Sequence, residues 1–395
     1  MRIYYVMPIR VPSEKAHTYQ VAKMCEGLAD YNNEVTLLIG RRKNFPELNK
    51  IDPYSYYNLK RNFQIKRVNI PDLIWLNNYL PKRLHYVMIF FYTFILGIIA
   101  IIYCKKGGAE LVLTRDSRIA FTISLFFKTV YEVHSYSENR LERLLERRAY
   151  KRLALLIVLT KHLRDRYLSI GYDCGKIKVL ADGVDLEMFD IGVYKDDAKR
   201  SIGFKEDWKI IGYIGNFLTL EMEKGLVELI LSSRYIKAND YKIVMVGGAK
   251  EVINRYEELI EREGLEKDKF IFWERKEHRE MPLLLKSFDC CVMPFPWTEH
   301  YAYYMSPLKM FEYMASRRPI VATDLLSVRE ILDEECAVIV SVGDIKALGE
   351  GISKILMDEN LAIRLADEAY KRVLGYTWNE RAKRLLEALN FDKKR

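Results

Sequence analysis

The chain has 395 residues, of which 50% are hydrophobic and 30% charged, with only 20 glycines and 11 prolines. This composition excludes a single small module, a collagen-like or low-complexity chain, and a largely disordered protein, and the length predicts two or three domains. The net charge of +9 is unevenly spread: residues 1–185 contain 30 Lys and Arg against 17 Asp and Glu, whereas the remainder contains 33 against 37.

The basic first half predicts an anionic partner, such as a lipid surface, a phosphorylated acceptor or nucleic acid. A lysine-rich solvated surface is the alternative on charge alone. No RNP, zinc-finger or helix-turn-helix pattern accompanies the charge, so we predict no nucleic-acid partner.

The six cysteines show no CxxC spacing, which favours reduced structural thiols over a zinc site or a disulfide framework. The opening residues, MRIYYVMPIR, lack the basic segment and apolar core of a signal peptide and are typical of a first strand. We therefore predict a protein that is not secreted and lies in the cytoplasm.

Short β-rich runs alternate with helical-period segments along the whole chain, a pattern typical of parallel sheets covered by helices. The first half is expected to form strands at residues 2–7, 34–39, 65–69, 110–114, 129–133, 154–159 and 177–180. A polar stretch, residues 193–207, predicts a linker. Beyond it, strands are expected at residues 209–214, 242–246, 269–272, 290–294, 319–322 and 337–340, and helices at 224–233, 251–263, 308–316, 345–357 and 361–373. The pattern predicts an α/β fold of two doubly wound domains, with a cleft between them as the default ligand site.

Residues 87–104 form an uncharged apolar run that is long enough to span a membrane. Expected strands lie on both sides of it, and a span would separate them, although strands of one sheet lie about 4.8 Å apart. We therefore favour a helix that is buried in its domain or lies along a membrane interface. Basic clusters at residues 41–43, 60–67 and 140–152 predict a peripheral anionic membrane surface as partner, with an ordinary amphipathic helix on a sheet as the alternative for the last cluster.

In the second half, Gly215 and Asn216 follow a strand, and Lys224 opens the next helix. A glycine at the end of a strand lets a ligand approach the backbone, and a lysine beside free helix N–H groups suits a phosphate. A solvated lysine is the alternative reading.

The motif Ser306-Pro307-Leu308-Lys309 also opens a helix. Serine as N-cap and proline at the first helical position would leave the N–H groups of Leu308 and Lys309 free for an anion. Glu312, on the same helical face, can accept hydrogen bonds from vicinal sugar hydroxyls. A phosphate site beside a diol site matches the two polar ends of a nucleotide, and the alternative is a capped helix with an internal Lys-Glu pair.

The segment SPLKMFEYMASRRPIVATDLLSVREIL resembles the donor-site signature of retaining GT-B glycosyltransferases of family 4, group 1. Further matches follow in family order and cover nearly the whole chain: PSEKAHTYQVAKMCEGLADYNNEVTLLI, LTRDSRIAFTISLFFKTVYEVHSYSE, ADGVDLEMF, GYIGNF with EKG, and YTWNERAKRLLEAL. The resemblance implies two Rossmann-like domains that face a central cleft. It implies an acceptor-binding domain over residues 1–190, with 82–104 as a possible membrane-surface helix, a nucleotide-sugar domain over 191–375, and a C-terminal helix, 376–395, packed on the first domain.

The resemblance also implies roles for single residues. Lys224 would contact the donor diphosphate beside the loop of Gly215 and Asn216, the helix start from Ser306 to Lys309 would cradle the phosphates, and Glu312 would hold the ribose. His134 would lie near the transferred sugar. The catalytic set is then His134, Lys224, Lys309 and Glu312, and the acceptor side has Ser13, Lys15, His17 and Arg115. Without the family, His134 and His17 are more often structural or surface histidines.

Several positions depart from the family pattern. The glutamate that many members carry eight positions before Glu312 is Tyr304, and Met305 replaces the glycine after it. Asn216 replaces an often basic residue, and SEKAH replaces the paired glycines of the first loop. These changes affect recognition of the donor sugar more than binding of the nucleotide.

The implied reaction moves a sugar, with retention of configuration, from a UDP-, GDP- or ADP-sugar to a hydroxyl acceptor. The leaving phosphate would assist deprotonation of the acceptor, and the lack of a DxD motif predicts that no metal is required. The basic, apolar-bearing first half predicts a lipid-linked acceptor or a cell-surface glycan precursor at the cytoplasmic face of the membrane. The alternative is a catalytically silent GT-B partner subunit that binds nucleotide or membrane.

Overall fold

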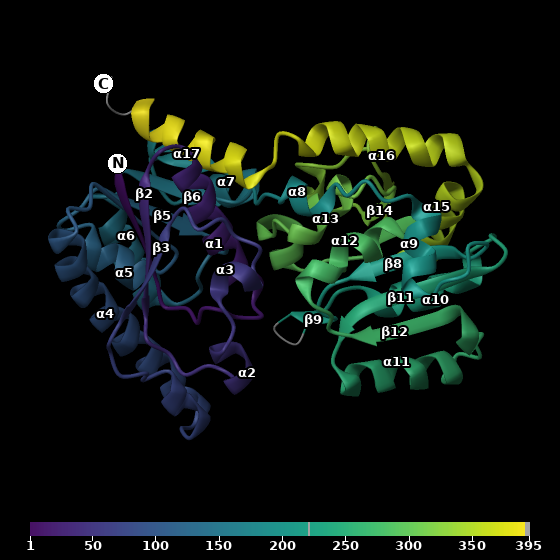
Figure 1. The fold of residues 1–395 in the computed structure, drawn as a ribbon, viewed down its shortest axis with the longest axis horizontal. Helices are drawn as coiled ribbons and strands as arrows, with labels where there is room; N and C mark the ends of the chain where they lie inside the picture. Colours follow the sequence, from purple (N-terminus) through teal and green to yellow (C-terminus); the bar gives the residue numbers. More distant parts are fainter. Residues whose placement is uncertain (220–221, 392–395) are drawn as a thin grey trace. The chain divides into compact units, whose positions relative to one another are not determined.

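The computed structural model describes residues 1–219 and 222–391, and these form two compact units (Figure 1). Unit 1 comprises Met1–Ala181 together with the described part of Trp378–Arg395, and unit 2 comprises Asp182–Thr377. The chain therefore leaves unit 1, forms unit 2, and returns to unit 1 with its last helix.

Within the described residues, unit 1 has one sheet of seven parallel strands in the order β3-β2-β1-β4-β5-β6-β7. The chain moves outward from β1 to β3 and then crosses to β4, so the order reverses beside β1. The predicted strands are all confirmed to within two residues at each end. The bounds are β1 (Arg2–Met7), β2 (Glu34–Gly40), β3 (Gln64–Val68), β4 (Leu111–Thr114), β5 (Thr129–Val133), β6 (Leu155–Val158) and β7 (Ile177–Val179).

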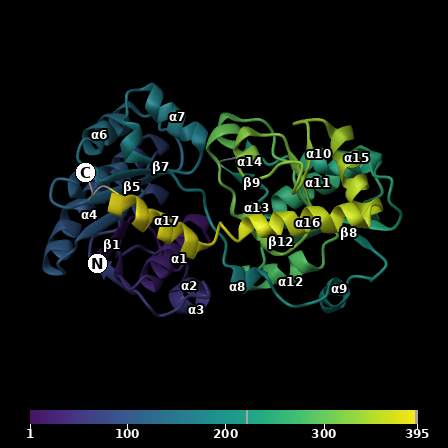
Figure 2. The same ribbon diagram turned by 90° about the horizontal axis from the view of Figure 1, so that it is seen from above.

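Helices cover both faces of this sheet. They are α1 (Ala16–Asp30), α2 (Pro46–Asn49), α3 (Pro53–Tyr56), α4 (Lys82–Lys106), α5 (Ser117–Ile123), α6 (Arg140–Tyr150), α7 (Lys161–Ser169) and the C-terminal α17 (Trp378–Phe391). Figures 1 and 2 both show α17 lying beside α1. Gly27 permits this approach, because a Cβ there would lie 3.0 Å from the carbonyl oxygen of Trp378.

Helix α4 contains the long apolar run. Within Leu84–Lys106, the most apolar window of 18 residues has a mean hydropathy of 2.5, and 33% of that window is buried. The buried stripe packs into the core of unit 1 through Tyr92, Leu96, Ala100 and Cys104. Strand β1 before the helix pairs directly with β4 after it, which is the arrangement of a helix packed on its own domain.

Within the described residues, unit 2 has a main sheet of six parallel strands in the order β12-β11-β8-β13-β14-β15 and a small β9-β10 ribbon. The strands are β8 (Lys209–Ile214), β9 (Leu218–Thr219), β10 (Met222–Glu223), β11 (Tyr241–Gly248), β12 (Phe270–Glu274), β13 (Cys290–Met293), β14 (Ile320–Thr323) and β15 (Val338–Val340). The helices are α8 (Leu186–Phe189), α9 (Lys195–Ile202), α10 (Leu226–Ser232), α11 (Lys250–Arg262), α12 (Met281–Lys286), α13 (Leu308–Ala315), α14 (Leu326–Arg329), α15 (Ile345–Met357) and α16 (Glu359–Val373).

Side-chain caps fix the starts of several helices, because each cap oxygen accepts a hydrogen bond from an N–H group of the first turn. The caps are Asp116 for α5, Asn139 for α6, Thr160 for α7, Asp344 for α15 and Asp358 for α16. Both sheets are parallel with helices on both faces, as the sequence predicts for two Rossmann-like domains.

Two predictions about the connection were wrong. Residues 193–207 are not a polar linker, because they contain α9, in which Lys199 is 1% exposed and its Nζ lies 2.9 Å from Oδ2 of Asp289. The first unit also ends at Ala181 rather than at residue 190. The N–H of Asp182 donates to Oγ of Ser306, and that of Val184 donates to the carbonyl of Tyr376, so this segment belongs to unit 2.

Candidate functional site

The first part of the site lies in unit 2, at the carboxyl end of β8. Gly215 has φ of 132°, a conformation that favours glycine. A Cβ at this position would lie 3.0 Å from Nζ of Lys309, in the first turn of α13. The backbone conformation thus favours glycine at this position, and the absence of a side chain leaves the space above it to the lysine.

Nζ of Lys309 is buried and makes no hydrogen bond with any residue that the structure describes. It lies 3.5 Å from the ring centroid of Tyr213 and 5.4 Å from that of Phe295. Desolvation and the nearby charge of Lys224 hold the pKa of Lys309 well below its usual value, against a smaller opposing effect of Glu312. A buried cation without hydrogen-bond partners is costly, so a bound anion would stabilise it strongly.

Lys224 supplies a second cation at the same place. Burial lowers its pKa to about 8. The following residue, Gly225, has φ of 80°, and a Cβ there would overlap the carbonyl oxygen of Pro294. This close packing fixes the backbone beside Lys224 at the start of α10, so the two lysines are held near each other by rigid elements.

The start of α13 corrects one prediction. Ser306 is not the N-cap: that position is Pro307, and no side chain in the part of the chain that the structure describes caps this helix. Oγ of Ser306 instead accepts from the N–H of Asp182, a contact that is distant in sequence and has no local signal. The N–H groups of Leu308 and Lys309 are nevertheless free for an anion, as predicted, since no described side chain caps them.

Glu312 lies on α13, one turn beyond Lys309, and is 9% exposed. Its Oε1 is 3.1 Å from Nε2 of His278, whereas Oε2 makes no hydrogen bond with a described residue. His278, which begins the short 3-10 helix His278–Glu280 after β12, was not among the predicted site residues. Asn216 is exposed, and its carbonyl accepts a hydrogen bond from the hydroxyl of Tyr213.

Tyr304, where many family members have glutamate, is buried, and its hydroxyl lies 2.7 Å from Oε1 of Glu299. Glu299 is itself exposed. A carboxylate therefore lies close to this position, supplied five residues earlier in the chain.

The second part of the site is a pocket of about 340 Å³ in unit 1, at the carboxyl ends of β1, β4 and β5. The structure brings three of the predicted residues together in its wall: His17, Arg115 and His134. Ser13 and Lys15 do not line this pocket. Ser13 is buried and exchanges backbone hydrogen bonds with the hydroxyl of Tyr57.

A buried carboxylate organises this pocket. Oε1 of Glu132 lies 2.7 Å from Nη2 of Arg115, 3.0 Å from Nη2 of Arg381 and 2.7 Å from Nε2 of His134. Burial alone would raise the pKa of Glu132, but the two arginines and His134 outweigh it and hold that pKa well below the usual range. An ionised carboxylate can only accept hydrogen bonds, so Nε2 of His134 carries a proton.

The sequence analysis missed Glu132 and Arg381, although the strand TVYEV contained a usable signal. A charged residue inside an otherwise apolar strand requires a cation close by. Arg381 comes from α17 and also donates to the carbonyl oxygens of Leu180 and Ala181, so the last helix of the chain helps to build the pocket.

Two further groups in the pocket have shifted pKa values. Desolvation, followed by the positive charges of Arg115, Lys15 and His134, lowers the pKa of His17 to about 4. The ring of His17 is therefore neutral near pH 7. Burial raises the pKa of Glu146 to about 7, although three tyrosine hydroxyls donate to its carboxylate.

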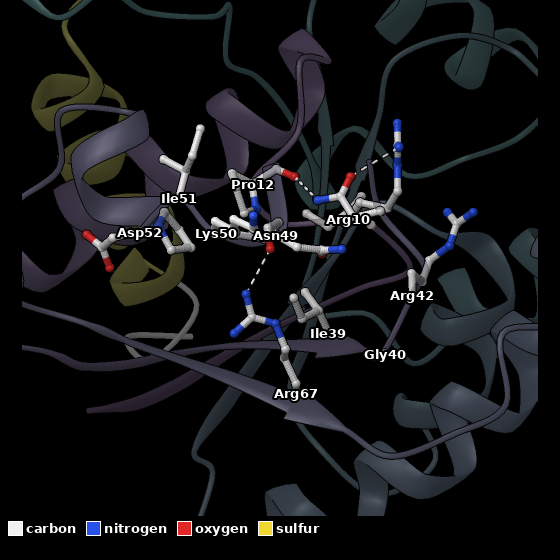
Figure 3. Close-up of a pocket in the computed structure, with 14 residues that line it drawn as sticks. Arg10, Pro12, Ile39, Gly40, Arg42, Asn49, Lys50, Ile51, Asp52 and Arg67 are labelled. Atoms are coloured by element: carbon white, nitrogen blue, oxygen red, sulfur yellow. Dashed lines mark hydrogen bonds between the residues drawn. The ribbon is translucent and has the colours of Figure 1, made fainter. Parts of the chain in front are cut away.

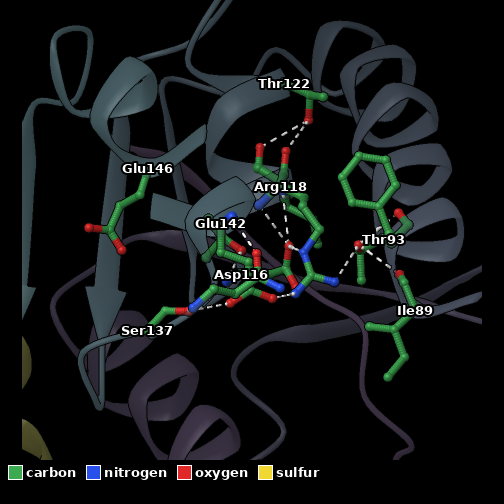
Figure 4. A network of polar contacts seen from close by, with 12 residues as sticks. Ile89, Thr93, Asp116, Arg118, Thr122, Ser137, Glu142 and Glu146 are labelled. Atoms are coloured by element: carbon green, nitrogen blue, oxygen red, sulfur yellow. Dashed lines mark hydrogen bonds and ion pairs between the residues drawn. The ribbon is translucent and has the colours of Figure 1, made fainter. Parts of the chain in front are cut away.

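A polar network joins this pocket to α4 (Figure 4). Nη2 of Arg118 lies 2.7 Å from Glu142 in the pocket wall, and Nη1 lies 3.4 Å from the hydroxyl of Thr93 on α4. Asp116 accepts from the backbone N–H of Arg118 and so fixes the start of α5. Ser137 completes the network by donating to Glu142.

Two compact units, each built on a parallel sheet with helices, are typical of the GT-B class of architecture. Residues 195–372 match the family model described as "Glycosyl transferases group 1", and residues 18–188 match "Glycosyltransferase Family 4". This chain therefore belongs to the GT-B glycosyltransferases of family 4, group 1, as its sequence motifs predict.

Known proteins agree with this assignment. A D-inositol 3-phosphate glycosyltransferase from Corynebacterium urealyticum is 26% identical over 227 residues, which cover 55% of this chain and about half, 52%, of that relative. Among solved structures, a sucrose-phosphate synthase from Thermosynechococcus elongatus has a TM-score of 0.73 at 18% identity over 98% of both chains. Anabaena Alr3699/HepE in complex with UDP has a TM-score of 0.71 at 14% identity, covering 99% of this chain and 100% of that one.

Proposed function

We propose that this protein is a retaining glycosyltransferase that transfers a sugar from a nucleotide-diphosphate sugar to a hydroxyl acceptor. The observation that carries the proposal is the buried Nζ of Lys309, which has no hydrogen-bond partner among the described residues and lies beside Gly215 and the start of α13, with Lys224 close by. Such a group of cations and N–H donors suits a diphosphate. Because the similar Anabaena structure contains UDP, a UDP-sugar is the first donor to test.

In the proposed reaction, the bond between the anomeric carbon and the diphosphate oxygen breaks while the acceptor oxygen bonds to that carbon. The acceptor proton passes to the departing phosphate on the same side of the sugar, so that configuration is retained. Negative charge grows on the diphosphate, and Lys224, Lys309 and the α13 N–H groups stabilise it. These groups supply the positive charge that a divalent cation would otherwise provide, so the proposed mechanism requires no metal.

Glu312 is proposed to bind the ribose. His278 already fixes one of its carboxylate oxygens, and the other is left to accept hydrogen bonds from vicinal hydroxyls. In unit 1, the pocket around His134 and Arg115 is proposed to receive the acceptor hydroxyl and the transferred sugar. Glu132 positions both of these side chains.

We further propose that the acceptor is lipid-linked or a glycan precursor and that unit 1 binds the cytoplasmic surface of an anionic membrane. Support comes from the side of α4 that faces solvent, where Phe91, Ile98 and Ile102 are each about half exposed. Exposed Lys105 and Lys106 end this helix, and Nζ of Lys105 lies 4.7 Å from the ring centroid of Phe126, another exposed apolar side chain. An apolar face bordered by cations is typical of interfacial helices.

The test is donor turnover by the purified chain with UDP-, GDP- and ADP-glucose. Lys309→Met should lower turnover by about 100-fold or more, because it removes a cation at the leaving group. Lys346→Met is the matched control, since Lys346 is exposed on α15, and it should turn over donor like the wild type.

Equal turnover by wild type and Lys309→Met would refute this site. Tight UDP binding by a wild-type chain that neither hydrolyses donor nor transfers sugar would instead favour the silent partner subunit.

A further inference from the structure

Unit 1 contains another pocket, of about 410 Å³, at the carboxyl ends of β1, β2 and β3 (Figure 3). It is separate from the pocket around His134, which β4 and β5 form. Its lining is rich in cationic side chains from four places in the chain: Arg10 after β1, Arg42 after β2, Lys50 after α2, and Arg67 on β3.

The lining contains one carboxylate, Asp52, and this carboxylate is already paired with groups outside the lining. Oδ2 of Asp52 accepts from the N–H of Ser55 at 2.9 Å and lies 2.9 Å from Nη2 of Arg61, which does not line the pocket. These contacts hold the pKa of Asp52 below its usual value. The four cations therefore dominate the electrostatics of the pocket.

Neutral groups hold two of the arginines in place. Nη2 of Arg67 donates to the carbonyl of Val11 at 2.8 Å, and no carboxylate of the described residues pairs with this guanidinium. Nη1 of Arg10 donates to Oδ1 of Asn44 at 3.2 Å, and Asn44 in turn donates to the carbonyl of Pro12 at 2.7 Å. The guanidinium groups are thus oriented in advance, which lowers the entropic cost of binding a ligand.

Carboxylates compensate the other charges only in part. Glu14 lies 2.9 Å from Nη2 of Arg10, and Asp72 lies 3.5 Å from Nε of Arg42. Arg67 and Lys50 have no such partner among the described residues, so the pocket keeps an excess of positive charge when empty. A ligand with negative charge would balance this excess.

We propose that this pocket binds a phosphate group of the acceptor. Planar guanidinium groups bind phosphate oxygens through paired N–H donors, and here three of them line one hollow. The volume lies within the range of about 300–1,000 Å³ that small-molecule sites occupy, so it leaves room for the sugar or polyol that carries the phosphate.

The ligand's role as acceptor rests on the proposed function, whereas the binding of phosphate does not. These two pockets meet the chain at the end of β1: Met7, the last residue of β1, lines the pocket around His134, and Ile9, two residues later, lines the pocket of the arginines. A phosphorylated acceptor anchored by Arg67 can therefore extend along the same sheet edge toward Arg115 and His134.

The experiment measures ligand binding by the full chain with UDP present at saturation, so that the lysines of unit 2 are occupied. The probes are glucose 6-phosphate, with glucose as its neutral control, and phosphatidylcholine vesicles with or without phosphatidic acid. Arg67→Gln should weaken binding of the phosphate probe about tenfold or more. Arg41→Gln, which removes an exposed arginine outside the lining, should bind like the wild type.

Binding of glucose 6-phosphate that depends on Arg67 assigns the pocket to a soluble phosphorylated acceptor. Binding of phosphatidic acid vesicles that depends on Arg67 assigns it to a lipid-linked one. Unchanged affinity in Arg67→Gln, an equal loss in Arg41→Gln, or no binding of either probe would overturn the proposal. None of these readouts requires turnover, so a chain that binds phosphate here but transfers no sugar would refute the proposed function alone.

Discussion

At the scale of single residues, the properties of the site come from charges that are buried and incompletely paired. Lys309 has an aromatic cradle and no hydrogen-bond partner among the described residues, and Lys224 has a pKa lowered to about 8. Glu132 is the opposite case, since three cationic or proton-bearing groups saturate it. A bound anion would therefore stabilise the charged form of the two lysines, whereas Glu132 already has its partners within the protein.

The depressed lysine pKa predicts that UDP binding depends on pH. A bound diphosphate stabilises the protonated lysine and raises its pKa, so binding takes up a proton when the free lysine is neutral. The affinity should fall as pH rises through about 8, where the free Lys224 loses its proton, by up to about tenfold per pH unit for that proton.

Calorimetry of UDP binding between about pH 7 and pH 9.5, in buffers of different ionisation enthalpy, would measure both the affinity and the proton uptake. Lys224→Arg should flatten the profile, because a guanidinium stays protonated throughout this range. An affinity that is constant, or that increases with pH, would contradict the assignment of Lys224.

At the scale of elements, α4 is a helix with two apolar sides. One side forms part of the core of unit 1, and the other exposes Phe91, Ile95, Ile98 and Ile102 to solvent. The Arg118 network of Figure 4 also ties this helix to the pocket around His134. The proposed partner of this exposed face is an anionic membrane, which its apolar side chains and lysines would suit.

The triple variant Phe91→Ser, Ile98→Ser and Ile102→Ser should therefore lose affinity for anionic vesicles at low salt by about tenfold or more, because it removes apolar area that inserts into the membrane. The control variant Met357→Ser, Ile363→Ser and Leu374→Ser alters comparably exposed apolar residues of unit 2. Vesicle flotation distinguishes the two. The same loss in both variants, or in neither, would argue against α4 as the membrane-binding element.

In the whole molecule, unit 1 is built from two segments that are separated in the sequence by the whole of unit 2. The chain leaves at Ala181 and returns at Trp378, and the departing and returning segments pair within unit 2 through Val184 and Tyr376. The returning helix contributes Arg381, which is 4% exposed and pairs with Glu132. The pocket around His134 thus depends on α17, the helix that supplies Arg381.

Arg381→Met should lower the free energy of unfolding by about 3 kcal/mol, because it removes one partner of a buried charge pair. Lys383→Met, at an exposed position of the same helix, should change it by less than about 0.5 kcal/mol. Urea unfolding of both variants, with Glu132→Gln to complete a double-mutant cycle, measures the coupling. A coupling near zero would mean that the ion pair does not stabilise unit 1.

The alternation of strands and helices, the positions of the main-sheet strands to within two residues, and the family could all be predicted from the sequence. The sequence also singled out Gly215, Lys224, Lys309 and Glu312, because each belongs to a short motif at a strand end or helix start. Such features are encoded locally, by apolar period and by residue type.

Other features of the fold and of the site became apparent only in the folded structure. The predicted polar linker contains helix α9. Ser306 bonds to Asp182 instead of capping α13, and Glu132 pairs with Arg381 of the last helix. The fold also gathers Arg10, Arg42 and Arg67 into one pocket. These outcomes depend on contacts between residues far apart in the chain, and such contacts arise only once the order of strands in the sheet brings their ends together.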